Sequence, residues 1–232
     1  GVQTCALPIS VAEREAPEFG ILKADEHGMI TSFIEKPKKE QLHDWVSDTG
    51  AEMHEAGRIY LASMGIYIFN RKLLNSLLLE EQKNATDFGK EIIPTSISNY
   101  KVASYQYDGY WTDIGNIYSF FEANLALTQE LPDFNLFDND NPVYTRARML
   151  PPAKISGTTL EKTIIAEGSI ILASRVENSV IGIRTRIGHG TTIVSCYIMG
   201  TDYYETLEEM NASRNNGLPR LGIGEQIGRA HV

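Results

Sequence analysis

The first half of the chain alternates apolar and polar segments in a pattern typical of strands joined by short turns. The apolar runs Gly20–Ala24 and Met29–Ile34 flank the polar segment Asp25–Gly28, whose charged residues and glycine predict a hairpin loop. Leu61–Phe69 reads as a buried strand, and Asn70 can cap a helix after it. The leucines of that helix fall on one face: Leu73, Leu74, Leu77 and Leu78. Strands mixed with helices indicate an α/β layer structure.

Between these elements the pattern is weaker. Gln41–Arg58 is polar without a steady period and predicts a loop with one short helix. Asp87–Pro94 reads as a loop that enters a short helix stopped by proline, and Lys101–Tyr107 alternates as a strand. Tyr110–Gly115 then leads into an amphipathic helix.

After Leu131 the character of the chain changes. Prolines with Asn and Asp between them predict a linker over residues 131–154. From Ile155 aliphatic residues recur every six positions, with small residues such as Gly168, Gly182 and Gly188 between them. The two series are Ile164, Ile170, Val176 and Ile181, Ile187, Ile193. This spacing resembles the hexapeptide repeat of a parallel β-helix, whereas the alternative is an ordinary twisted sheet with accidental spacing.

The two ends of the chain are related through their coding DNA. Thr4–Ile9 can be encoded by DNA whose reverse complement, read one base along, encodes Ile227–Val232. That DNA resembles a sequencing-library adapter, so we expect residues 1–9 and 227–232 to be translated scar and leave them out of fold reasoning. On this interpretation the natural gene is cut at both ends.

Composition narrows the class of function. The formal net charge of −9 argues against nucleic acid, whose phosphates need a basic surface. Neither a membrane span nor a disordered tail is indicated. Cys5 lies in the expected scar, so Cys196 has no partner for a disulfide, which fits a reducing compartment. An anionic ligand would have to be held by local cations.

Several short segments carry candidate chemistry. Glu35-Lys36 offers a carboxylate for hydroxyl groups beside an ammonium for a phosphate, although a lone pair of this kind is usually a solvated surface pair. Ser63 and Tyr67 bracket a glycine on an apolar strand, where a buried hydroxyl needs a partner. Asp87 reads either as a helix N-cap or as a ligand for hydroxyl groups.

In order and spacing, five segments together resemble ADP-glucose pyrophosphorylase (glucose-1-phosphate adenylyltransferase). They are Phe33–Pro37, Ser63–Tyr67, Asp87–Lys90, Tyr110–Gly115 and Met199–Glu205. The resemblance runs from about Phe19 to Gly224. It implies a partial nucleotidyltransferase domain with a Rossmann-like mixed sheet, over residues 10–130. A partial left-handed parallel β-helix of hexapeptide repeats follows the linker, over residues 155–226.

The resemblance also implies roles for individual residues. Glucose 1-phosphate would be bound by Gly20, Glu35, Lys36, Ser63, Tyr67, Asp87, Phe88 and Trp111. Lys36 and Asp113 are the residues expected at the reacting groups, with Asp113 as one of two acids that hold Mg²⁺; the second acid is not in this chain. The alternative for Asp113 is a cap on the helix that follows it. Arg184 is a weak candidate for a phosphorylated effector, and the alternative for it is a solvated charge on a β-helix face.

The family binds ATP through a glycine-rich segment that has no counterpart here, because Gly222-Ile223-Gly224 lacks the third glycine and the strand-turn-helix context. We therefore expect ATP to bind only the full-length parent, a homotetramer in the cytoplasm, or in a plastid if the source is a plant. A related enzyme that makes UDP-N-acetylglucosamine or GDP-mannose would share the same two-domain plan. The sequence also leaves open a non-catalytic regulatory subunit and a purely structural β-helix protein.

Overall fold

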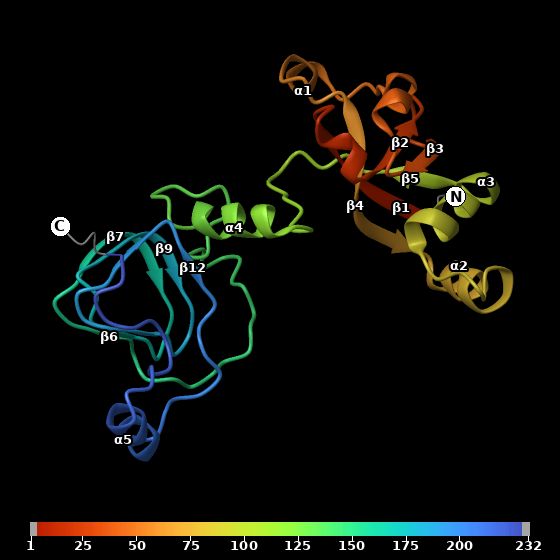
Figure 1. The fold of residues 1–232 in the computed structure, drawn as a ribbon. Helices are drawn as coiled ribbons and strands as arrows, with labels where there is room; N and C mark the ends of the chain where they lie inside the picture. The colour runs from red at the N-terminus through yellow and green to blue at the C-terminus, as the bar shows by residue number, and fades with distance from the viewer. Residues whose placement is uncertain (1–3, 229–232) are drawn as a thin grey trace. The chain divides into compact units, whose positions relative to one another are not determined.

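The computed structural model describes residues 4–228, which divide after Trp111 into two units. The first unit is built on a five-stranded mixed sheet of order β3-β2-β4-β1-β5 (Figure 1). β1 runs antiparallel to β4 and parallel to β5. The strands are β1 (Thr4–Val11), β2 (Gly20–Ala24), β3 (Ile30–Glu35), β4 (Tyr60–Phe69) and β5 (Val102–Ser104).

Short helical segments join these strands. They are η1 (Ala16–Glu18), η2 (Lys39–Trp45), α1 (Ala51–Glu55), α2 (Arg71–Ser76), η3 (Leu77–Glu81), η4 (Phe88–Ile92) and α3 (Ile93–Asn99). The predicted hairpin is confirmed, because β2 pairs antiparallel with β3 around Asp25–Gly28. Asn70 caps α2 as expected, and its side chain accepts from the Lys72 N–H at 2.9 Å.

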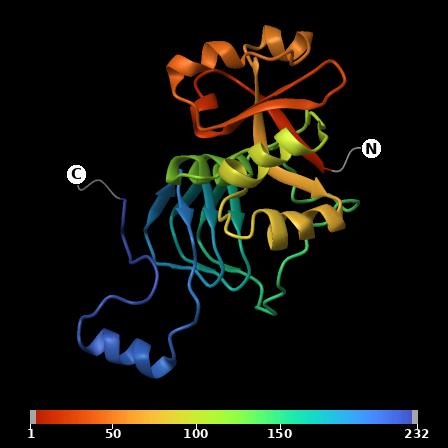
Figure 2. The ribbon, with the colours of Figure 1, turned by 90° about the vertical axis from the view of Figure 1, so that its right-hand side faces the viewer.

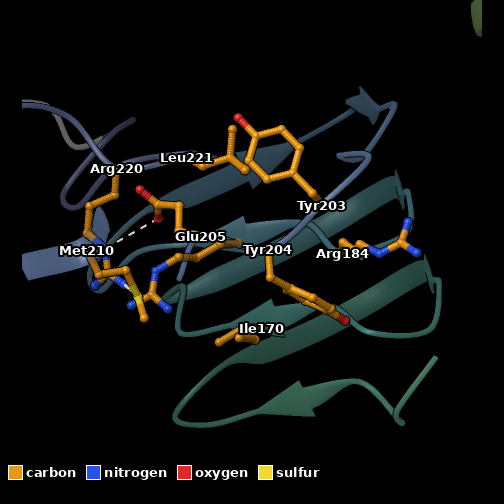
Figure 3. Close-up of a pocket in the computed structure, with 9 residues that line it drawn as sticks. Ile170, Arg184, Tyr203, Tyr204, Glu205, Met210, Arg220 and Leu221 are labelled. Atoms are coloured by element: carbon orange, nitrogen blue, oxygen red, sulfur yellow. Dashed lines mark hydrogen bonds and ion pairs between the residues drawn. The ribbon is translucent and has the colours of Figure 1, made fainter. Parts of the chain in front are cut away.

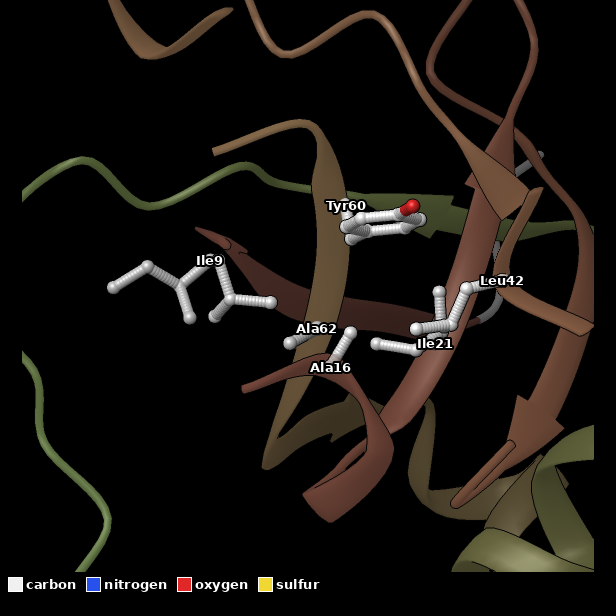
Figure 4. Packing of buried hydrophobic residues seen from close by; sticks show 7 residues of the cluster. Ile9, Ala16, Ile21, Leu42, Tyr60 and Ala62 are labelled. Carbon is white, nitrogen blue, oxygen red and sulfur yellow. The ribbon is translucent and has the colours of Figure 1, made fainter. Parts of the chain in front are cut away.

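The core of the first unit lies against the sheet. Ile21, Leu42 and Ala62 are at most 1% exposed and belong to one apolar cluster, which also contains Ile9, Val11, Ala16 and Tyr60 (Figure 4). Burying apolar side chains of this size stabilises a fold by roughly 1.5–3 kcal/mol each. The cluster fixes the hairpin of β2 and β3 against β4, and the candidate site lies at the end of that hairpin.

Residues 4–9 belong to an interior strand of this sheet. β1 pairs with β4 on one side and β5 on the other, and Ala6 is 1% exposed. Leaving residues 1–9 out of the fold therefore omits an interior strand, which has hydrogen-bonded neighbours on both sides. The origin of the segment in an adapter stays a prediction. Residues 1–3 and 229–232 of the expected scars lie outside the described residues.

The second unit contains coils of parallel strands stacked side by side (Figures 1 and 2). Ile155 pairs with Ile171, and Ile171 pairs with Ile187, so each coil advances 16 residues in this stack. The strands of the coils are β6 (Lys154–Ile155), β7 (Thr159–Ile165), β8 (Ile170–Ile171), β9 (Arg175–Ile181), β10 (Arg186–Ile187), β11 (Thr192–Val194) and β12 (Tyr197–Ile198).

The interior of the coils departs from one of the two predicted series. Ile181, Ile187 and Ile193 are buried as expected, and so is Val176. In the first series, however, the interior position is taken by Ile171, with Ile165 packed against the same cluster, rather than by their neighbours Ile170 and Ile164. Successive residues of a strand point to opposite faces, so a shift of one residue exchanges the inside and the outside. Where two isoleucines are adjacent, the sequence does not show which of them faces the interior, and the packing decides it.

The corners of the coils contain a stack of left-handed residues. Lys162, Asn178 and Ser195 have φ values of 45°, 43° and 49° and occur at successive breaks in the strands. The Asn178 side chain donates from Nδ2 to the Ser195 hydroxyl at 3.0 Å. Asn tolerates this backbone region better than most residues, because its short side chain can hydrogen-bond locally.

Two helices belong to the second unit. In α4 (Ile117–Ala126), Phe120 makes an edge contact with Tyr197 of β12 at 4.9 Å, and Thr128 beyond the helix bonds Asn178 at 3.1 Å. Residues 112–130 therefore pack with the coils, although the sequence groups them with the first domain. Residues 131–153 carry no helix or strand, consistent with the predicted linker. The sequence did not predict α5 (Leu207–Asn215), which begins with a Thr206–Glu209 capping box.

The interior register can be tested by a matched pair of substitutions. Ile171→Ala should lower the free energy of unfolding by about 2–5 kcal/mol, because Ile171 is fully buried. Ile155→Ala, one coil earlier in the same stack, should cost less than about 1 kcal/mol, because Ile155 is 42% exposed. Urea unfolding monitored by circular dichroism measures both values. Equal losses would show that the interior register is wrong.

Candidate functional site

The carboxylate of Glu35 lies between two glycines at the end of the β2–β3 hairpin. Gly20 is the direct strand partner of Glu35. A Cβ atom added at Gly20 would collide with the Phe33 ring and would lie 2.8 Å from Glu35 Oε2. A Cβ added at Gly89 would lie 2.9 Å from the same oxygen. Both glycines therefore leave the space that Glu35 occupies, and Gly89 brings η4 to the hairpin.

A bulge in β4 joins the hydroxyls of Ser63 and Tyr67. Four residues along a straight strand span about 13 Å, yet these two oxygens are 2.9 Å apart. The pairing with β1 shifts register between these residues, and Gly65 between them has a φ of 72°. The Gly65 N–H also donates to Ser63 Oγ at 3.3 Å. Glycine adopts this left-handed backbone without steric cost, so it permits the bulge that brings the hydroxyls together.

Asp87 and Phe88 enter the site at the start of η4. Asp87 caps this segment, since its Oδ1 accepts from the Lys90 N–H at 2.9 Å. The Phe88 ring stacks on Tyr67 with centroids 6.4 Å apart and an interplanar angle of 17°. Phe69 contacts both rings. The capping role of Asp87 is confirmed, and its second carboxylate oxygen has no protein partner within the described part of the chain.

These contacts define one group of side chains, here called the Glu35 cluster: Gly20, Glu35, Ser63, Tyr67, Asp87 and Phe88. The charges of this cluster affect the pKa of Tyr67. Partial burial raises the pKa of the Tyr67 phenol above its usual value, the hydrogen bond with Ser63 acts in the opposite direction, and the carboxylates of Glu35 and Asp87 raise the pKa further. Glu35 and Asp87 therefore lie close enough to Tyr67 for their negative charges to disfavour its ionisation.

Lys36 and Trp111 border the cluster. The backbone N–H of Lys36 donates to the Phe19 carbonyl at 3.0 Å, and the φ of Lys36 is 48°. Left-handed backbone is uncommon for a residue with a Cβ, particularly before a proline, and such conformations concentrate at functional sites. The ring of Trp111 makes an edge contact with Phe19 at 5.5 Å. Phe19 thus links both residues to Gly20.

Asp113 belongs to the second unit and is exposed. Its Oδ2 accepts from the Gly115 N–H at 3.2 Å. It does not cap α4, because Asn116 does so by accepting from the Ser119 N–H at 2.9 Å. The alternative of a helix cap is therefore wrong, and the metal-binding role stays a prediction.

The residues present do not by themselves make a magnesium site. Within residues 4–228 no group of three or more His, Cys, Asp or Glu side chains could hold a metal ion. Asp113 would supply one hard oxygen ligand of the kind that Mg²⁺ binds together with waters and phosphate oxygens. We assign no chemical step to a metal.

Arg184 lines a cavity of about 120 Å³ in the second unit. Figure 3 shows Arg184 at one end of the cavity and Arg220 with Glu205 at the opposite end, with Tyr204 between them. The Arg184 guanidinium lies 5.8 Å from the centre of the Tyr204 ring, a cation–π arrangement. Arg184 is half-buried, so it is not simply a solvated charge.

Two further arginines line the same cavity. Burial lowers the pKa of Arg186, and so does the neighbouring positive charge of Arg220, whereas Glu205 and Glu225 act in the opposite direction. Glu205 lies 3.7 Å from Arg220, and its side chain is 13% exposed. The cavity therefore holds two cations that repel each other and a largely buried carboxylate.

The structure thus brings together six of the predicted substrate-binding residues and places Lys36 and Trp111 beside them. Sequence reasoning missed Gly89 and Glu91. Gly89 approaches Glu35, which is far away in the sequence. Glu91 accepts from the backbone of Thr86 and Asp87, which precede it in the chain. It also missed Arg186 and Arg220. The signal that could have found Glu91 is an acid a few residues after a capping Asp, a pattern typical of helix starts.

Residues 3–130, more than half of the chain, match the family model described as "Nucleotidyl transferase". Residues 148–230 match the model described as "GLGC left-handed parallel beta-helix domain". The predicted fold class is confirmed: a mixed sheet with helices, followed by a left-handed parallel β-helix. Among the described residues, no helix has the length and apolar character needed to cross a membrane.

The raised pKa of Tyr67 has a measurable consequence. In an ultraviolet titration, the difference between wild type and Tyr67→Phe should show a phenol that ionises above about pH 10. Because the folded pKa is raised, the contribution to stability is complete below the unfolded pKa. It is lost as pH rises through the folded pKa, so wild type should lose more stability than Tyr67→Phe above about pH 10. A difference spectrum that titrates below pH 10 would contradict this assignment.

Proposed function

Because the chain belongs to the nucleotidyl transferase family, we propose that it carries the glucose 1-phosphate half of an ADP-glucose pyrophosphorylase. The observation that carries this proposal is the Glu35 cluster, which gathers two carboxylates and two hydroxyls at the hairpin end where Lys36 follows Glu35. The match of residues 148–230 to a β-helix domain of the GLGC type supports the choice within the family.

The chemistry of the cluster suits a sugar. Carboxylates accept hydrogen bonds only, so Glu35 and the uncommitted oxygen of Asp87 can each accept from sugar hydroxyls. The Ser63 and Tyr67 hydroxyls can donate or accept, and the stacked Tyr67 and Phe88 rings provide an apolar wall. The ammonium of Lys36 supplies the positive charge that a phosphate needs in a chain whose net charge is −9.

In the parent enzyme, an oxygen of glucose 1-phosphate would attack the α-phosphorus of ATP. One oxygen–phosphorus bond forms, the bond from the α-phosphorus to the bridging oxygen breaks, and pyrophosphate leaves with the electron pair. Such transfers depend on in-line positioning and charge neutralisation rather than on covalent bonds to the protein. The residues of the Glu35 cluster would orient the sugar, and Lys36 would hold its phosphate. Asp113 would supply one oxygen ligand to a Mg²⁺ ion, whose charge would offset that of the phosphates.

The role of Lys36 can be tested on this chain. Lys36→Ala should weaken the binding of glucose 1-phosphate by about 10- to 100-fold, the loss expected for a charged hydrogen bond. Isothermal titration calorimetry measures the affinity, and Lys38→Ala, which removes another exposed lysine of the same segment, should leave it unchanged. In a full-length version, the KM for glucose 1-phosphate should rise far more than that for ATP. Equal rises would count against the assignment.

The ATP-binding segment of the family has no counterpart in this chain, so the nucleotide has to be identified by experiment. Assaying a version that carries such a segment with ATP and UTP would separate an ADP-glucose enzyme from one that makes a UDP-sugar. A full-length protein that binds glucose 1-phosphate but turns over neither nucleotide would be a regulatory subunit.

We further propose that the cavity lined by Arg184, Arg186 and Arg220 binds a phosphorylated effector. The gathering of three arginines in one cavity favours this function, since a bound dianion would offset positive charge that Glu205 only partly compensates. The apolar side chains of Ile170, Met210 and Leu221 could contact the carbon part of such a ligand.

The effector cavity has its own test. Arg186→Gln should weaken the binding of phosphoglycerate by about 10-fold, as expected for the loss of a charged hydrogen bond. Arg214→Gln removes an exposed arginine of α5 that does not line the cavity, so it serves as the control. Calorimetry with phosphoglycerate, and separately with inorganic phosphate, measures the change. An unaltered affinity in Arg186→Gln would exclude this cavity as the effector site.

A further inference from the structure

The carboxylate of Glu91 binds the backbone of the turn that presents Asp87. Its Oε2 accepts from the Thr86 N–H at 2.8 Å, from the Asp87 N–H at 3.0 Å and from the Thr86 hydroxyl at 3.3 Å. All three donors belong to the two residues before Phe88. The carboxylate therefore binds the backbone just before η4 and not the backbone of η4 itself.

The same turn meets the Glu35 cluster at three points. Asp87 contributes its carboxylate, Phe88 stacks on Tyr67, and Gly89 leaves the space in which Glu35 Oε2 lies. A small movement of the Thr86–Asp87 backbone would displace all three contacts, because they are carried by consecutive residues. A misplacement of about 1 Å is enough to weaken a site of this kind strongly.

The bonds of Glu91 go beyond an ordinary capping box, because they include the Thr86 N–H and hydroxyl as well as the N–H of the capping residue. The start of η4 is already capped by Asp87, whose Oδ1 accepts from the Lys90 N–H. Glu91 instead accepts from the N–H of the capping residue, so that the cap is itself held in place. These N–H bonds also lower the pKa of Glu91 below its usual value, as expected for a carboxylate that accepts from backbone N–H groups.

We propose that Glu91 is a positioning residue for the sugar-phosphate site, and that it acts by holding the backbone of Thr86 and Asp87. For the identity of the ligand, this inference rests on the proposed binding of glucose 1-phosphate. Glu91 needs no contact with the ligand, since its effect passes through Asp87 and Phe88.

The test is a double-mutant cycle read by calorimetry with glucose 1-phosphate. Glu91→Ala should weaken binding by about 10-fold. Glu91→Gln keeps an oxygen acceptor and should recover most of that loss. Glu55→Ala removes an exposed glutamate of α1 and should bind as wild type. In the Asp87→Ala background, Glu91→Ala should cost clearly less than the tenfold expected in the wild type, since part of its effect passes through the Asp87 carboxylate and the rest through Phe88.

An unchanged affinity in Glu91→Ala would overturn the proposal, and so would a full additional loss in the Asp87→Ala background, since either result would separate Glu91 from Asp87. If the wild-type chain binds no glucose 1-phosphate, the proposed function fails, and amide hydrogen exchange then decides the role of Glu91. Faster exchange at Thr86 and Asp87 in Glu91→Ala, but not in Glu55→Ala, supports the holding role. Unchanged exchange overturns it.

Discussion

The close approach of the Glu35 carboxylate to two backbones is the constraint on which the candidate site depends. Side chains in a folded protein pack as densely as in organic crystals, so an added methyl group at either glycine would have to displace its neighbour. Gly20 lets the backbone of the hairpin come close to the Glu35 carboxylate, and Gly89 lets the backbone of the turn before α3 come close to it. Because both act on one oxygen, the hairpin and the turn are held close to each other, and the charges of Glu35 and Asp87 both act on Tyr67.

That arrangement concentrates negative charge in a chain that is already acidic. Both carboxylates raise the pKa of Tyr67, and Lys36 is the cation that follows Glu35 in the sequence. A ligand that offers hydroxyl donors at one end and a phosphate at the opposite end fits this distribution, because each end meets a group of complementary character. The left-handed backbone of Lys36 and the bulge at Gly65 are departures from regular strand geometry, and both lie beside the cluster. Irregular backbone is commonly retained where a site requires it.

The second unit follows a simpler rule. Each coil repeats the hydrogen-bonded register of the one before it, so a single buried aliphatic position is extended into a continuous apolar core. Polar side chains are left for the corners and the outer faces. Arg184 and Arg186 belong to the coils, and Arg220, which follows α5, lines the same cavity, where Glu205 offsets part of their charge.

Local sequence patterns by themselves determined the elements whose residues interact with near neighbours. The β2–β3 hairpin, the Asn70 cap and the coiled second unit could be predicted because turn chemistry, capping and six-residue spacing are properties of short segments. Resemblance also identified all six residues of the Glu35 cluster. The tertiary structure alone decided that Thr4–Val11 is an interior strand, since its burial comes from partners elsewhere in the chain. It also decided which isoleucine of each pair faces the interior, that a bulge joins Ser63 to Tyr67, and that Gly89 makes room for Glu35. Each of these depends on distances between segments, and a sequence pattern does not specify such distances.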